Sequence, residues 1–280
     1  MSKKVKESQY INSRLNNAMM NYQVYVPGKS EKFLILTVLF LAGGFVGLIF
    51  YGGLFMEEGK ATNATYIANT IAFVVTGCLA GKFFMPIYIE RRLEKRRLAL
   101  KLQFKEMLAS LSASISSGSN VQKAFEDVLS DLRMQYEEKD FIITEMQEIL
   151  NGAAQNINFE IMIRDFGERS DNEDIMCFAD VFEICYRKGG DLKSVIQKTY
   201  YAIGEKMAVT DEIETKLTSN KMQHNVMSIM PIVVVAMLKF TNDSFADNFA
   251  TPVGVFVNTI AIGIFIASYR YGLKICSIKV

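Results

Sequence analysis

The sequence has a single histidine, His224, among 280 residues. Metal sites built from several histidines are therefore excluded, and hydrolases that need a catalytic histidine are disfavoured. Four cysteines are present, and no two have the close spacing of a metal-binding pair, so neither a zinc site nor a disulfide framework is indicated. A phosphate-binding loop is also missing, because the nearest match, Gly77–Lys82, is one residue short and lacks the following Ser or Thr. We therefore expect no catalytic, cofactor or metal site.

Charge is scarce in two paired blocks of the chain, although the whole sequence is nearly balanced, with 31 basic and 30 acidic side chains. Segment 33–55 is uncharged throughout and exceeds the ~20 residues needed to cross a ~30 Å hydrocarbon core. A second apolar segment runs from about Thr65 to Ile89, and its Lys82 can extend a long stem to the lipid headgroups. Two membrane-spanning helices are therefore predicted within residues 33–90.

A second pair of apolar segments lies within residues 223–271. One is uncharged from Val226 to Leu238 and contains Pro231, which membrane helices tolerate. The other, Val253–Tyr269, would form about 26 Å of helix, which is short but adequate for a thin or locally adapted bilayer. The sequence thus predicts an all-α integral membrane protein with four transmembrane helices arranged as two hairpins.

Lysine and arginine counts predict the orientation, because basic flanks are retained in the cytoplasm. Residues 1–32 carry six, residues 91–105 carry seven and residues 270–280 carry three, whereas the two hairpin loops carry almost none. Both termini and the middle domain of this multi-pass protein are therefore expected in the cytoplasm. The predicted divisions are a cytoplasmic N-terminal segment (1–32), a first transmembrane hairpin (33–90), a cytoplasmic helical domain (91–222), a second hairpin (223–271) and a cytoplasmic tail (272–280).

Six helices are predicted in the middle domain, because apolar residues recur there at helical spacing without strand-like alternation. The clearest apolar stripe follows Asn120, the expected N-cap, and the stripe from Leu100 to Ile115 continues the second membrane helix. Ser170 and Glu173 match a capping box that would open the fifth helix. Asp191 is expected to cap the sixth, which continues into the third membrane segment. Together these helices would form a compact six-helix bundle.

Paired glycines occur in both helices of the first predicted hairpin. Gly43 and Gly47 are four residues apart, as are Gly77 and Gly81. Small residues at this spacing let membrane helices approach closely. We therefore interpret the four glycines as a helix-packing motif.

An acidic cluster, Asp171, Glu173 and Asp174, lies at the predicted start of the fifth helix. Its carboxylates suit a divalent cation, but the cluster lacks the glycine and the spacing of a calcium loop. Acidic side chains in a first turn also complement the helix dipole. The dipole interpretation is favoured, and cation binding stays open.

Two motifs carry a resemblance to a known family. The stretch LQFKEMLASLSASISSGSNVQKAFEDV resembles the first motif of the type II secretion system F domain, in which a helix, a Ser/Gly turn and an Ala-Leu/Phe-Glu helix follow in order. The second motif is also similar, with a Gly-Gly-Asp-Leu turn, a long charged helix and a proline in the following apolar segment. The two motifs cover roughly residues 98–240. The residues that carry them are Ser117, Gly118, Ala124, Phe125, Glu126, Gly189, Gly190, Asp191, Leu192 and Pro231.

Two apolar hairpins around a single such domain resemble the TadB and TadC type of the Tad (Flp) pilus machinery. The GspF or PilC type differs, since it carries the domain twice. The resemblance implies an inner-membrane platform protein that couples a cytoplasmic secretion ATPase to the extraction and assembly of prepilin or pilin subunits and catalyses no reaction. The implied partners are this ATPase, the pilin, a second copy or a paralogous platform protein, and the lipid bilayer, with no nucleic acid.

A small membrane transporter or channel is the main alternative function. Its path would be marked by intramembrane polar groups such as Lys82, Lys239 and Asn258. Both lysines lie near the ends of predicted spans, where snorkelling accounts for them, so only Asn258 lies deep enough to favour a path. A membrane enzyme is a third possibility, but the predicted spans contain no cluster of His, Cys or Asp.

The predicted topology can be tested by labelling. Single cysteines at Gly59 and Ser244, in a cysteine-free background, should react with a membrane-impermeant thiol reagent in intact cells, because both hairpin loops are expected outside. A cysteine at Ser130 should react only after the cells are opened. Labelling at Ser130 in intact cells would overturn the whole arrangement.

Overall fold

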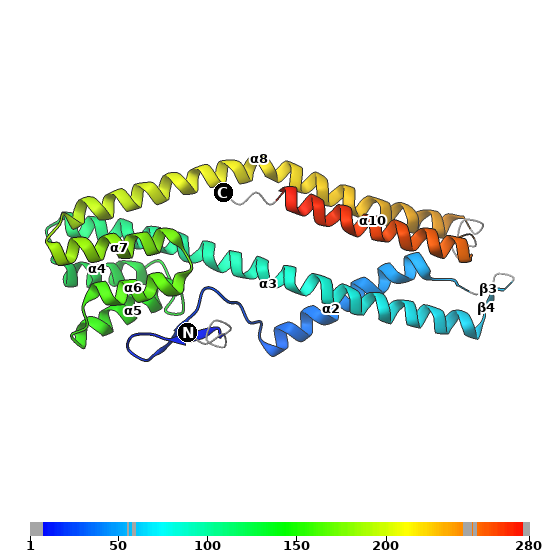
Figure 1. Ribbon diagram of the computed structural model, residues 1–280, viewed down its shortest axis with the longest axis horizontal. Helices are drawn as coiled ribbons and strands as arrows, with labels where there is room; N and C mark the ends of the chain where they lie inside the picture. Colours follow the sequence, from blue (N-terminus) through cyan, green and yellow to red (C-terminus); the bar gives the residue numbers. More distant parts are fainter. Residues whose placement is uncertain (1–7, 55, 58–59, 243–247, 249–250, 277–280) are drawn as a thin grey trace. The chain divides into compact units, whose positions relative to one another are not determined.

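The computed structural model describes residues 8–54, 56–57, 60–242, 248 and 251–276, and helices dominate it (Figure 1). The fold divides into two compact units: the first contains Met1–Val26 and Ile89–Val209, and the second contains Pro27–Tyr88 and Thr210–Val280. The predicted all-α class is confirmed, with two short antiparallel hairpins added. The described elements are β1 (Tyr10–Asn12), β2 (Ala18–Met20), α2 (Lys29–Tyr51), β3 (Met56–Glu57), β4 (Lys60–Ala61), α3 (Asn63–Ser116), α4 (Val121–Arg133), α5 (Phe141–Ala154), α6 (Phe159–Ser170), α7 (Glu173–Lys188), α8 (Leu192–Thr241) and α10 (Pro252–Cys276).

The helices of the first unit pack their apolar stripes around one core. Asn120 opens α4 as predicted, because its side chain accepts a hydrogen bond from the Lys123 backbone N–H at 2.8 Å. Edge-to-face contacts join Phe104 of α3 to Phe166 of α6 and to Phe178 of α7, with ring centroids 6.1 and 5.6 Å apart. The apolar residues of α3, α4 and α7 that are buried in this core include Leu100, Phe104, Leu108, Leu111, Ala124, Phe125, Val128, Leu129, Leu132, Ile175, Phe178 and Phe182.

Glycines close two of these helices in the left-handed conformation. Gly118 follows the end of α3 with φ of 94°, and Gly189 follows the end of α7 with φ of 72°. Gly190 then donates its N–H to the Cys185 carbonyl at 2.8 Å, which satisfies a carbonyl in the last turn of α7. Asp191 caps α8 as predicted, since its carboxylate accepts a hydrogen bond from the Ser194 N–H at 3.1 Å.

The predicted capping box at Ser170 is wrong. The helix α6 extends to Ser170, so its hydroxyl lies in the last turn of α6, where it donates to the Gly167 carbonyl at 2.8 Å. Asn172 caps α7 instead, accepting hydrogen bonds from the N–H groups of Asp174 and Ile175 at 2.9 and 3.4 Å. The sequence pattern failed because two helices meet here with only two residues between them.

The N-terminal segment, residues 8–26, has a structure that the sequence did not predict. Strands β1 and β2 pair antiparallel, with Tyr10 opposite Met20. Asn16, between the strands, adopts a left-handed conformation with φ of 61°, which asparagine tolerates. The side chains of Met19 and Tyr22 are buried in the first unit. This segment is therefore an integral part of that unit.

In the second unit, α2 and α3 approach closely at small residues. A Cβ added to Gly43 would lie 3.0 Å from the Thr76 carbonyl oxygen, and one added to Gly77 would lie 2.8 Å from the Phe40 carbonyl oxygen. Gly47 also faces Thr76, whereas the nearest atom to Gly81 belongs to the flexible side chain of Leu36. Gly43, Gly47 and Gly77 thus lie where the helices meet, and Gly81 lies in a looser part of the contact.

Two described helices, α2 and α3, contain segments long and apolar enough to cross a membrane. Only 11% of each apolar segment is buried inside the protein, so these residues do not serve as core. The shorter apolar segments Asn225–Thr241 and Val253–Tyr269 belong to α8 and α10. The third and fourth spans remain predictions. The proposed labelling positions Gly59 and Ser244 and the His224 side chain lie outside the described part of the chain.

The C-terminal end of α2 is bonded to each of the other long helices of the second unit. The Lys239 ammonium group of α8 donates to the carbonyls of Ile49 and Gly52 at 3.1 and 2.5 Å. The Tyr51 hydroxyl lies 3.0 Å from that of Thr259 in α10, and Asn69 of α3 accepts a hydrogen bond from the Gly53 N–H. Lys239 therefore neutralises the negative end of a helix dipole, which is a different role from the predicted snorkelling.

The positive φ at Gly189 gives a stability prediction. Gly189→Val should lower the free energy of unfolding by about 1–2 kcal/mol, because a β-branched residue is strained in the left-handed conformation. Gly189→Asn should cost less, since asparagine tolerates that conformation. Thermal melting of the purified proteins compares the two, and an unchanged melting temperature for Gly189→Val would contradict the assigned turn.

Candidate functional site

An ionic network inside the first unit is centred on Arg169, near the end of α6. Its guanidinium donates two hydrogen bonds to the Glu145 carboxylate of α5, at 2.7 and 2.6 Å, and one to Asp165 at 2.9 Å. Another N–H reaches the Met20 carbonyl at 3.3 Å. The Arg169 and Glu145 side chains are 4% and 1% exposed, so the pair is almost completely removed from water. Such a pair is maintained only when each charge has its partners.

Burial and pairing act against each other in this network. Burial alone would lower the pKa of Arg169, but the carboxylates of Glu145 and Asp165 outweigh it and raise the pKa. Burial raises the pKa of Glu145, and the Arg169 charge opposes that increase. Burial and the neighbouring Glu145 carboxylate also raise the pKa of Tyr22 well above its ordinary value. Tyr22 therefore stays protonated and serves as a hydrogen-bond donor.

The same network fastens the N-terminal segment to α5 and α6. The Tyr22 hydroxyl donates to Glu145 at 3.0 Å, and its backbone N–H donates to the Arg169 carbonyl at 3.1 Å. Ser13 donates a hydrogen bond to the buried carboxylate of Glu148, which also accepts one from Asn17 at 3.0 Å. Four polar contacts of this kind hold the segment in place because their partners are buried.

Sequence reasoning missed these buried charged residues. Their only sequence signal is position: Glu145 lies at helical spacing from Ile142 and Ile149, on the stripe that α5 turns towards the core. A charge on such a stripe indicates a partner, but the partner Arg169 lies on another helix. The pairing therefore depends on the tertiary fold.

Two of the three acidic residues of the cluster, Asp171 and Asp174, are paired with basic side chains. Asp171 forms an ion pair with Arg97 of α3. Asp174 lies between Lys101 of α3 and Lys206 of α8, at 3.1 and 3.0 Å. Burial alone would raise the pKa of Asp174, but hydrogen bonds from the two lysines lower it. The described part of the chain contains no group of three or more His, Cys, Asp or Glu side chains that could hold a metal ion.

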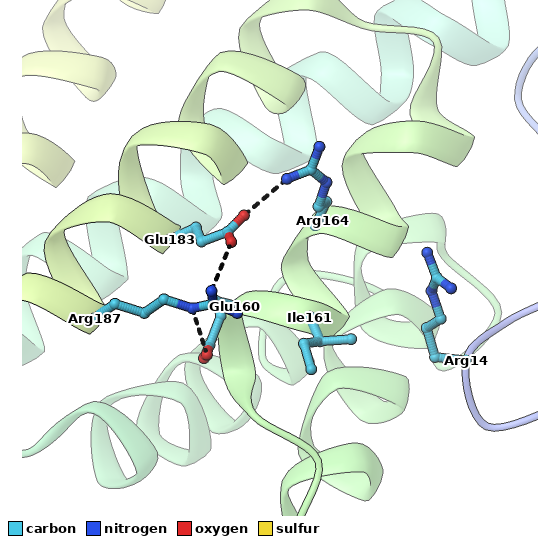
Figure 2. Close-up of a pocket in the computed structure, with 6 residues that line it drawn as sticks. All are labelled: Arg14, Glu160, Ile161, Arg164, Glu183 and Arg187. Carbon is cyan, nitrogen blue, oxygen red and sulfur yellow. Dashed lines mark hydrogen bonds and ion pairs between the residues drawn. The ribbon is translucent and has the colours of Figure 1, made fainter.

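A pocket of about 250 Å³ opens on α6 and α7 beside the N-terminal segment (Figure 2). Glu183 accepts a hydrogen bond from Arg164 at 2.9 Å and faces Arg187 at 3.5 Å, while Arg187 also donates to the buried Glu160 at 3.4 Å. Arg14, on the other side of Ile161, lies 3.7 Å from Asp165 and Glu168. Each positive group here faces a carboxylate of the protein itself, so a paired ionic network lines the pocket. The Glu160 Oε2 atom is buried and makes no hydrogen bond within the described part of the chain.

The residues of the two motifs that resemble the F domain lie at separate places in the chain, at or beside two helix corners and inside α8. Gly118 lies in the α3–α4 turn, Ala124 is buried in the core, and exposed Glu126 lies 3.9 Å from Lys123. In the second motif, Leu192 packs against the core at the start of α8, after the turn that contains the exposed residues Gly189, Gly190 and Asp191. Pro231 lies inside the continuous helix α8. These residues form turns, pack in the core or lie within a helix, and they do not come together as a cluster of reactive groups.

Comparison with protein-family models, with curated proteins and with solved structures found no match to this chain. The resemblance to the F domain therefore depends on the motif residues themselves.

Removing one partner of the buried pair should be costly. Arg169→Met should lower the free energy of unfolding by roughly 3–5 kcal/mol, because Glu145 would be left charged and buried. Arg164→Met is the matched control, and should cost under about 1 kcal/mol because its ion pairs are half exposed. Chemical denaturation of both variants provides the measurement, and Arg169→Met/Glu145→Gln should recover part of the loss. Equal stability of the two single variants would show that the buried pair is misassigned.

Proposed function

We propose that this chain is a platform protein of a type II secretion or Tad (Flp) pilus machine, embedded in the inner membrane by two helical hairpins. In this role it couples a cytoplasmic secretion ATPase to the extraction and assembly of pilin subunits. The two F-domain motifs support the proposal, because they occur in the family order and form the α3–α4 and α7–α8 corners of one helical unit.

The observation that carries the proposal furthest is the continuity of α3 and α8. Helix α3 runs from Asn63 to Ser116 and helix α8 from Leu192 to Thr241, so each belongs to both compact units without interruption. One unit is rich in paired charges, and the other contains the apolar segments with little internal burial. A machine part that passes displacement from a soluble partner to membrane helices needs continuous elements of this kind.

The four-span topology is the finer part of the proposal. The apolar segments of α2 and α3 have the length and low burial expected of lipid-exposed helices. The α8 and α10 segments would complete two hairpins, with both termini in the cytoplasm. The hydrogen bonds from Lys239 and between Tyr51 and Thr259 support this arrangement, because they join the second hairpin to the first.

Charge indicates the kind of soluble partner. Acidic residues outnumber basic residues nearly two to one between residues 106 and 224. Several acidic side chains of this region are exposed, among them Glu126, Glu137 and Glu138. A basic surface on the ATPase would therefore be steered towards the first unit, and the association should weaken with salt.

A transporter or channel remains the rival function, and one observation favours it. The Asn258 side-chain nitrogen in α10 is buried and makes no hydrogen bond within the described part of the chain. An unsatisfied polar group in a predicted membrane helix is the kind of feature that marks a substrate path. Lys239 no longer supports that function, because its ammonium group is bonded to the backbone of α2.

Co-purification with the secretion ATPase of the same organism separates the two functions. The platform hypothesis predicts ATPase association at low ionic strength, weaker association at high ionic strength, and no solute flux in reconstituted vesicles. Asn258→Leu should leave the association unchanged. Flux that Asn258→Leu abolishes, without any ATPase association, would refute the platform hypothesis and support the channel.

A further inference from the structure

Three segments of the chain lead from the first unit to the second. They are the N-terminal segment, which ends at Val26, the helix α3, which enters the first unit at Ile89, and the helix α8, which leaves it after Val209. These are the three places at which the backbone passes from one unit to the other, so a displacement that travels along the backbone must pass through them.

One short stretch of the first unit contacts all three segments. We call this stretch, Arg169–Asp174, the α6–α7 corner. It holds the N-terminal segment through two backbone contacts, one from the Arg169 guanidinium to the Met20 carbonyl at 3.3 Å and one from the Tyr22 N–H to the Arg169 carbonyl at 3.1 Å. The corner thus fixes the segment four residues before it leaves the unit.

The same corner holds both long helices through carboxylates. Asp171 pairs with Arg97 of α3, whose Nε also donates to the Tyr22 carbonyl at 3.2 Å. Asp174 is shared between Lys101 of α3 and Lys206 of α8. Its side chain is only 17% exposed, so both lysines interact with it under limited screening.

These contacts lie near the places where the segments leave the first unit. Lys206 precedes Met207, the last core residue that α8 contributes, and Val209, the last residue of the unit in that helix. On α3, Arg97 lies before Leu100, the first α3 residue buried in the core. The corner therefore contacts all three segments at the edge of the hydrophobic core, before they leave the first unit.

The corner itself is built to resist deformation. Asp171 adopts a left-handed conformation with φ of 51°, and Asn172 satisfies the N-terminus of α7. Gly167 lets α6 and α7 approach closely, since an added Cβ would lie 3.1 Å from the Met176 sulfur. Arg169 anchors the corner to α5 through Glu145. A displacement of α6 and α7 would therefore move the corner as one piece.

We infer that the α6–α7 corner is the coupling point of this protein. When a bound partner displaces α6 and α7, the corner moves the N-terminal segment, α3 and α8 together. The use of this coupling rests on the proposed platform function, with the ATPase as the partner. The coupling itself is a property of the fold and can be measured without the ATPase.

The test uses the full-length protein in vesicles. Spin labels at the exposed positions Leu98 of α3 and Tyr201 of α8, in a cysteine-free background, report the distance between the two helices. Asp171→Asn/Asp174→Asn removes the ties and keeps the size of both side chains, and asparagine tolerates the left-handed conformation at position 171. We expect a clearly broadened distance distribution relative to the unsubstituted residues.

A matched double variant, Glu173→Gln/Asp180→Asn, removes the same charge from exposed positions of α7. It should leave the distance distribution unchanged. Lys206→Gln removes the ion pair between α8 and Asp174 and keeps the ion pairs of α3. It should also broaden the distribution. An unchanged distribution in Asp171→Asn/Asp174→Asn, or equal broadening in the matched control, would overturn the inference.

A second measurement separates this inference from the proposed function. If both hold, Asp171→Asn/Asp174→Asn keeps its salt-dependent association with the ATPase while pilus assembly in cells falls several-fold. If the unsubstituted protein binds no ATPase, the platform function fails, and the spin-label distances still decide whether the corner couples the helices. Full assembly by this variant alongside normal ATPase binding would show that the corner transmits nothing the machine needs.

Discussion

The buried pair of Arg169 and Glu145 is the interaction on which the first unit most depends. A guanidinium and a carboxylate are placed where water cannot solvate them, so each requires the other together with the neighbouring donors and acceptors. Those neighbours come from α6 and from the N-terminal segment, through Asp165, Tyr22 and the Met20 carbonyl. The cost of leaving any of these groups unpaired makes the whole arrangement specific, in a way that apolar packing alone does not.

This constraint also explains how a short N-terminal segment becomes part of a helical unit. Residues 8–26 bury only a few apolar side chains, chiefly Met19 and Tyr22. Buried polar groups on α5 and α6 supply the remaining partners. Nearer the surface, Asp171 and Asp174 of the α6–α7 corner form ion pairs with basic residues of α3 and α8. The fully buried ion pair in the interior is thus followed by ion pairs that water partly screens, near the surface where three segments leave the unit.

The second unit is held by different physics. Its helices α2 and α3 approach at Gly43, Gly47 and Gly77, where the absence of a side chain permits close backbone contact. Polar groups join the remaining helices at the end of α2, with the Lys239 ammonium bonded to its last carbonyls. A membrane environment favours both kinds of contact. The hydrophobic effect does not drive helix association in lipid, and lipid offers no water to hydrogen-bond backbone polar groups.

The sequence by itself determined the helices and most of their ends, because these follow from local rules: apolar spacing, the caps at Asn120 and Asp191, and the left-handed glycines Gly118 and Gly189. It also identified the apolar segments and the packing glycines. The tertiary structure alone decided which charges meet, since Glu145 and Arg169 lie on different helices and Lys239 binds a helix end far away in sequence. The capping box at Ser170 failed for the same reason: local patterns carry no information on where the preceding helix stops when two helices nearly abut.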